Sequence, residues 1–191
     1  MKIERRWFLG VTVLLLPMFA SSIAKGDREE TAVRWDIIHF ISFNPPTVEA
    51  GGRSSALAED MSKIILTGSG TFVVGDSEEV TGGGTWEVRD KDGNLTGSGT
   101  YQVIRLVRFD LAPGRPGPTL VDTIGNVADL RAGLAYLRIR YSDGSQGILV
   151  VSCQLLTSPR SIFEGITASK DFVDFWSPAG PDGTLFHVVS E

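Results

Sequence analysis

The chain has 191 residues, 42% of them hydrophobic, and a formal net charge of −5. Because it is acidic and has no run of basic residues, we expect it to bind neither nucleic acid nor anionic membranes. It contains one cysteine, Cys153, which excludes an internal disulfide. This cysteine lies in an alternating apolar segment, so we expect a buried free thiol and not a catalytic nucleophile.

The first 24 residues have the three parts of a secretory signal peptide: a basic start, the apolar run 11–20, and small residues at Ser22 and Ala24. The run is shorter than the ~20 residues of a membrane span. We therefore expect export to the periplasm or the cell exterior and one mature β domain, residues 25–191. Two adjacent arginines near the start resemble a bacterial twin-arginine signal, so both the Sec and the twin-arginine routes remain open.

The first strand of the mature chain is expected over Val33–Ile41, where apolar and polar side chains alternate. The sequence Asn44-Pro45-Pro46 ends it, because proline cannot donate to a strand ladder. From residue 48 to residue 66 we expect a strand, a turn and a second strand. One helical turn over residues 56–61 is the alternative.

A short phrase then occurs three times, and it is the most regular feature of the chain. It reads Thr-Gly-small-Gly-Thr-aromatic-x-Val and begins at Thr67, Thr81 and Thr96, in steps of 14 and 15 residues. A period of this length suits one strand and its turn. The glycines before each aromatic residue indicate bulges, bends or close packing, which would curl the sheet. We predict an all-β fold, a single small antiparallel barrel, with a β-sandwich as the alternative.

The rest of the chain continues in the same style. The strand of the third copy extends to Leu111, and the proline- and glycine-rich residues 112–118 form a surface loop. A short helix is expected over residues 126–131. A hairpin follows over residues 134–156, with its turn at Asp143-Gly144, and residues 183–190 form a closing strand that meets the first strand.

An exported antiparallel chain with repeated Gly-Thr-aromatic turns resembles, in outline, the calycin-type and the allene-oxide-cyclase or dirigent-type small barrels. The resemblance implies an architecture of this kind. The Gly-x-Trp motif of lipocalins is not present, since Trp35 lacks the preceding glycine. No functional residue is therefore carried over from those families.

The sequence holds few groups that point to catalysis. His39 and His187 could approach one another if the first and last strands pair, with Asp36 or Glu191 as a third ligand. A zinc or copper site needs three or four convergent ligands, and no His-x-His spacing supplies them. We therefore expect no metal and no cofactor. No nucleophile elbow, dinucleotide fingerprint or phosphate loop occurs, so the sequence does not indicate an enzyme.

A binding site is the remaining possibility, and a small barrel can hold one small ligand. Three aromatic side chains of the repeat would point inward. A cluster of three more near the C-terminus, Phe172, Phe175 and Trp176, could form a lid, and one arginine joins the inner face if alternation persists. The predicted ligand-binding residues are Phe72, Trp86, Tyr101, Phe175, Trp176 and Arg105. The alternatives are that the aromatic residues are ordinary core and that a bulge turns the arginine outward.

Three functions follow from these patterns. The first is an exported barrel that binds a small apolar or amphipathic molecule. The second is a structural or interaction module that presents loops on a rigid β scaffold without a pocket. The third is a small-barrel isomerase or hydrolase that uses Arg105, His39 or His187 inside the cavity.

Overall fold

The computed structural model describes residues 31–180 and 183–190. The expected signal peptide, residues 1–24, lies outside the described residues, so export stays a prediction. The described chain is all-β, with one 3₁₀ turn, η1 (Val127–Asp129), before the tenth strand. The strands are β1 (Thr31–Phe43), β2 (Pro46–Ala50), β3 (Ser54–Leu57), β4 (Lys63–Leu66), β5 (Ser69–Val73), β6 (Asp76–Val80), β7 (Gly83–Arg89), β8 (Leu95–Ala112), β9 (Val121–Asp122), β10 (Leu130–Tyr141), β11 (Gln146–Cys153), β12 (Gly165–Lys170), β13 (Val173–Phe175), β14 (Ser177–Pro178) and β15 (Gly183–Ser190).

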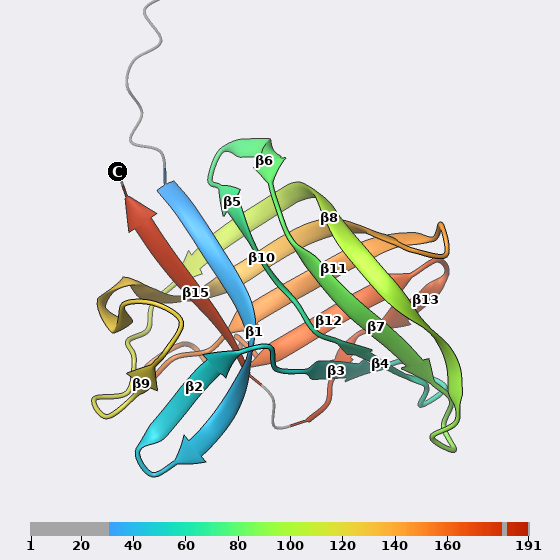
Figure 1. Cartoon of the computed structure of the whole chain (residues 1–191), viewed down its shortest axis with the longest axis horizontal. Helices are drawn as coiled ribbons and strands as arrows, with labels where there is room; N and C mark the ends of the chain where they lie inside the picture. The colour runs from blue at the N-terminus through green and yellow to red at the C-terminus, as the bar shows by residue number, and fades with distance from the viewer. Residues whose placement is uncertain (1–30, 181–182, 191) are drawn as a thin grey trace, which may run out of the picture.

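Six of these strands close into an antiparallel barrel, in the order β1, β5, β7, β8, β10 and β15 (Figure 1). The last strand pairs with the first from Thr31↔Ser190 to Ile38↔Gly183. It also meets the start of β10, where Leu130 lies opposite His187. The predicted barrel, and the predicted meeting of the last strand with the first, are confirmed.

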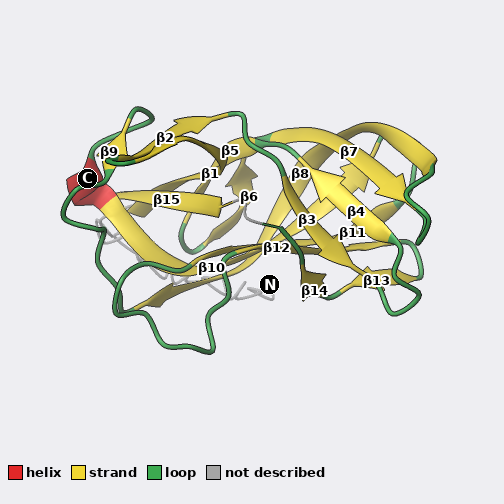
Figure 2. Ribbon diagram, turned by 90° about the horizontal axis from the view of Figure 1, so that it is seen from below, coloured by secondary structure: helices red, strands yellow, loops and turns green. Residues whose placement is uncertain are grey.

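The sheet continues beyond the barrel at one end. Strands β4, β3 and β14 follow the second half of β7, and β11, β12 and β13 follow β10. Strands β3 and β14 lie against β12, so this end has two facing layers (Figure 2). The molecule therefore combines a closed ring with a short sandwich-like extension, and the extension is where β7 and β8 leave the barrel.

The three copies of the repeated phrase fall on β5, β7 and β8, as predicted. Strands β7 and β8 form the expected hairpin, with Trp86 opposite Gly99. The first two copies are less regular than a simple meander, because β6 intervenes and pairs back onto β5. As a result β5 meets β7 only at Ser69↔Gly83.

Glycines within the repeat allow close approach, as their positions indicated. A Cβ atom on Gly84 would lie 2.0 Å from the carbonyl oxygen of Thr67, so only glycine fits there. A Cβ atom on Gly97 would lie 3.1 Å from the Trp86 ring. The indole ring therefore packs directly over the backbone of β8 at Gly97, where the strand has no side chain of its own.

The core contains two groups of aromatic rings. In the barrel, Phe109 makes edge contacts with Phe72 at 5.1 Å and with Phe186 at 5.3 Å between ring centroids. In the extension, Tyr141 contacts Trp86 at 5.6 Å and Tyr101 at 6.4 Å. Figure 1 shows the second group's strands, β7, β8 and β10, running from the ring into the extension.

Several smaller predictions can be compared with the structure. Residues 48–66, where a strand, a turn and a second strand were expected, contain the end of β2 and then β3 and β4 joined by a turn. The alternative helical turn over residues 56–61 does not form. The expected short helix is the 3₁₀ turn η1, which begins where the side chain of Asn126 accepts a hydrogen bond from the backbone N–H of Ala128. Cys153 is buried and free, and burial raises the pKa of its thiol.

Candidate functional site

A hollow with three aromatic residues in its lining lies in the extension, between the β7–β8 hairpin and the β12–β13 hairpin, and we call it the Trp86 hollow. Its volume is about 360 Å³, within the range of small-molecule sites. Strands β7 and β8 form one wall and residues 170–175 form the other, and the turn between β10 and β11 adds Asp143. The lining residues are Trp86, Val88, Thr96, Gly97, Asp143, Lys170, Asp171, Phe172, Val173 and Phe175.

Lys170 contributes the positive charge to the lining of this hollow. Its ammonium nitrogen lies 4.7 Å from the centroid of the Trp86 ring and 5.2 Å from that of Tyr141, in cation–π geometry. The same nitrogen donates a hydrogen bond to Oδ2 of Asp143 at 2.5 Å. This hydrogen bond, together with one from Ser145, lowers the pKa of Asp143 to about 2. The ion pair therefore persists at neutral pH.

The β12–β13 turn carries an aromatic side chain beside the hollow. Asp171 has a left-handed backbone conformation with φ of 52°, and the next residue, Phe172, is fully exposed. A fully exposed phenylalanine leaves a large apolar area in water, about 1.5–3 kcal/mol less favourable than a buried one. Its position at the rim of the Trp86 hollow is where a bound molecule would cover it.

The structure places the predicted ligand-binding aromatic residues in different parts of the fold. Trp86 and Phe175 both line the Trp86 hollow. Phe72 and Tyr101 are buried, as expected, but Phe72 packs in the barrel group and the Tyr101 hydroxyl donates to the carbonyl oxygen of Thr67. Of the three aromatic residues of the repeat, Trp86 and Tyr101 belong to one group of rings and Phe72 to the other, and of the three Trp86 alone lines the Trp86 hollow.

Trp176 does not form a lid with Phe175. In an extended segment successive side chains alternate faces, so the burial of Phe175 turns Trp176 outward, where it is 61% exposed. Phe172, the third residue of the predicted lid cluster, lies at the rim of the hollow. The sequence grouped these residues correctly, but it did not show which of them faced inward.

Arg105 does not point into the barrel, so the prediction of a charge inside is wrong. The pairing of β8 with β10 shifts between Arg105 and Val103, which leaves Ile104 as an extra residue. This bulge interrupts the alternation. Leu106 consequently takes the inward position and Arg105 is exposed.

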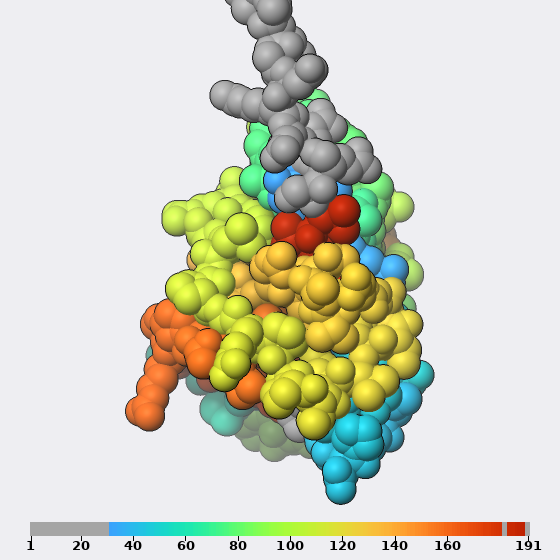
Figure 3. All heavy atoms as spheres, turned by 90° about the vertical axis from the view of Figure 1, so that its left-hand side faces the viewer, coloured from blue at the N-terminus to red at the C-terminus, as the bar shows by residue number. Residues whose placement is uncertain are grey.

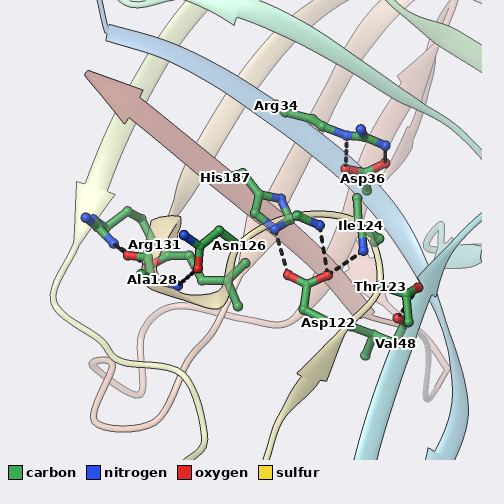
Figure 4. A network of polar contacts seen from close by, with 12 residues as sticks. Arg34, Asp36, Val48, Asp122, Thr123, Ile124, Asn126, Ala128, Arg131 and His187 are labelled. Carbon is green, nitrogen blue, oxygen red and sulfur yellow. Dashed lines mark hydrogen bonds and ion pairs between the residues drawn. The ribbon is translucent and has the colours of Figure 1, made fainter. Parts of the chain in front are cut away.

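A second polar site lies outside the barrel wall, under the segment of residues 113–129. Figure 3 shows this segment, in yellow, spread over one face between β15 in red and the β1–β2 hairpin in blue to cyan. Beneath it, Nε2 of His187 lies 2.7 Å from Oδ2 of Asp122, and both side chains are buried (Figure 4). The other carboxylate oxygen, Oδ1, accepts backbone N–H groups of Ile124 and Gly125.

This Asp122–His187 pair was not predicted. His187 lies opposite Arg34 of β1. The guanidinium of Arg34 donates hydrogen bonds to both carboxylate oxygens of the buried Asp36 (Figure 4). Within the described residues Nδ1 of His187 has no hydrogen-bond partner. That nitrogen is enclosed by protein. We therefore interpret the contact between Asp122 and His187 as a structural one, which holds residues 113–129 against β15.

The two histidines are not brought together. His39 is exposed and lies opposite Glu49 on β2, beyond the last residue at which β1 pairs with β15. The two histidines are therefore unrelated, although the first and last strands do pair. Glu191 lies outside the described residues. Among residues 31–180 and 183–190 no three His, Cys, Asp or Glu side chains gather closely enough to hold a metal ion.

No protein-family model, curated protein or solved structure matches the chain. No helix in the described part of the chain is long and apolar enough to cross a membrane. The surface features of this small antiparallel β-barrel domain are therefore the basis on which its function is proposed.

Proposed function

We propose that this β-barrel domain binds a small, uncharged amphipathic molecule with an aromatic body in the Trp86 hollow. The observation that carries the proposal is the fully exposed Phe172 at the rim of a hollow with Trp86 in its wall. A flat aromatic body would lie against Val88 and Thr96 of the β7–β8 wall, because the Trp86 ring already covers Gly97. Phe172 and Val173 would cover its other side.

The polar groups of the hollow favour an uncharged ligand. The ammonium of Lys170 is already paired with Asp143, and a second carboxylate, Asp171, lies 3.8 Å from it. One cation between two carboxylates leaves no excess positive charge to hold an anion. The Thr96 hydroxyl donates to the carbonyl oxygen of Val88. Its oxygen and the rim carboxylates can accept hydrogen bonds from a ligand's polar end and fix its orientation.

A neutral fluorescent probe tests this proposal. N-phenyl-1-naphthylamine has two aromatic ring systems and one N–H group, and its emission rises in apolar surroundings. We expect saturable binding of one probe per chain with energy transfer from tryptophan. The variant Phe172→Ser should bind about tenfold more weakly, since it removes part of the ~1.5–3 kcal/mol that burial of a phenylalanine contributes.

Phe43→Ser is the matched control, because Phe43 is also exposed and lies at the end of β1, paired with Pro46 of β2, outside the lining of the hollow. It should leave probe binding unchanged. Equal weakening by both variants would mean nonspecific adsorption to exposed aromatic residues. Absence of saturable binding by the folded chain would refute the proposal and favour the interaction module.

A further inference from the structure

The outer face of the barrel carries an arginine cluster that the Trp86 hollow does not use. Arg105 on β8 and Arg138 on β10 are direct cross-strand neighbours, and both are exposed. Arg140 lies two residues after Arg138 on the same face. Side chains that lie opposite each other have Cβ atoms about 4.5–5.5 Å apart, and like charges in this arrangement destabilise a sheet.

Carboxylates do not neutralise this cluster. None of the ion pairs between described residues includes Arg105, Arg138 or Arg140. Nη2 of Arg105 donates to Oγ of Ser77 at 3.1 Å, and Nη2 of Arg138 donates to Oε1 of Gln146 at 3.1 Å. Each guanidinium therefore has a neutral acceptor that orients it and further N–H groups that remain available.

The two guanidiniums border a hollow of about 520 Å³, which we call the arginine groove. Apolar side chains of Val107 and Ile148 form part of its floor, and Ser169 and Gln146 add hydrogen-bonding groups. Asp171 is the one carboxylate in the lining, and it lies 3.8 Å from the Lys170 ammonium. The groove is therefore locally basic, although the whole chain has a net charge of −5.

From these observations we propose that the arginine groove binds a small molecule that carries an oxyanion group, held between Arg105 and Arg138. A guanidinium presents its N–H groups in a planar fork that matches carboxylate, phosphate and sulfate oxygens. An oxyanion between the two side chains replaces their mutual repulsion with two attractive contacts. The apolar floor accommodates a short carbon skeleton beside the charged group.

The bulge in β8 is what assembles this groove. Because Ile104 is extra, Arg105 turns outward and comes into register with Arg138. Without the bulge, Arg105 would occupy an inward position on the strand, where no anion could reach it. Bulges that redirect one side chain are common beside binding sites.

Titration of the whole chain with three sodium salts tests the proposal by backbone amide NMR. The probes are inorganic phosphate, sulfate and succinate, at pH 7 and low ionic strength. We expect saturable shifts of the amides of Gly147 and Ile148, with a dissociation constant on the order of 1 mM for the best probe. The ranking of the three salts distinguishes phosphate, sulfate and carboxylate as the group that the groove prefers.

Variants then assign the binding to the two arginines. Arg105→Gln and Arg138→Gln should each weaken binding of the best probe about tenfold or more, because each removes charge-assisted hydrogen bonds. Arg160→Gln has the same change of charge at an exposed position outside the groove, so it should have no effect. All three positions are exposed, and retained amide dispersion confirms that each variant is folded.

Two results would overturn the proposal. One is a set of linear shifts spread over the surface with no saturation by any of the three salts. The other is unchanged affinity in both Arg105→Gln and Arg138→Gln. The Trp86 hollow is tested with an uncharged naphthylamine and the arginine groove with anions. Absence of binding at one site is therefore distinguishable from absence of binding at the other.

Discussion

Glu164 makes the stability of this protein depend on pH near neutrality. Its carboxylate is largely buried and accepts backbone N–H groups of Thr184, at 2.6 Å, and of Gln154. Burial raises the pKa of Glu164 to about 7, although these hydrogen bonds favour the charged form. The ordinary value for a glutamate is 4.5.

The direction of the effect follows from the protons bound in each state. Below pH 4.5 the carboxyl is protonated in both the folded and the unfolded chain. Between pH 4.5 and 7 the unfolded chain has released this proton while the folded chain still holds it, so the free energy of unfolding falls as the pH rises. Above pH 7 the loss is complete, and the interval between the two pKa values corresponds to about 3 kcal/mol.

Urea denaturation at several pH values from 4.5 to 8 measures this loss. The wild-type chain should lose about 3 kcal/mol of unfolding free energy across the window, and Glu164→Gln, which cannot titrate, should not show this loss. Glu59→Gln is the control, because Glu59 is exposed. Parallel profiles for wild type and Glu164→Gln would refute the assignment of the pH dependence to this carboxyl.

Two further predictions concern stability. Asp122→Ala should lower the free energy of unfolding by about 2–3 kcal/mol, measured by urea denaturation, because it leaves His187 and two backbone N–H groups without an acceptor. Gly84→Ala should cost about 3 kcal/mol, since its Cβ would meet the Thr67 carbonyl oxygen. Gly93→Ala, at a turn with φ of 87° and open space around it, should cost only about 1–2 kcal/mol in the same assay.

The barrel could be predicted because the information that specifies it is local and repeated. Alternation places Trp86 and Tyr101 inward on their strands, and both are buried. Glycines before the aromatic residues predicted close packing, and Gly97 and Gly84 are covered by a ring and a backbone carbonyl. These features depend on residues within one strand and its neighbour, so a single sequence is enough to read them.

The candidate sites could be predicted only in part, because their partners are distant in the chain. Lys170 meets Asp143 across 27 residues, and His187 meets Asp122 across 65. Asp143 precedes a glycine, which indicates a turn, and nothing in its surroundings predicts a lysine partner. The outward turn of Arg105 was foreseen only as the alternative, because the extra residue of the bulge is an isoleucine, which gives no sign of irregular backbone.

The strand number of the ring explains why the sites lie outside it. A barrel of about eight strands has an interior just wide enough to be filled by side chains or to hold one small ligand. This ring has six strands, and the rings of Phe72, Phe109 and Phe186 pack against one another within it. The proposed binding surfaces therefore lie where strands leave the ring or on its outer face.

The Trp86 hollow meets the first of these conditions, and the arginine groove meets the second. The first lies where β7 and β8 run beyond the ring and face the β12–β13 hairpin, and the second depends on a bulge in the same β8 strand. Both are lined by Asp171, at the tip of that hairpin. The long β8 strand thus supplies one wall of each proposed site, and its bulge determines that Arg105 faces the arginine groove.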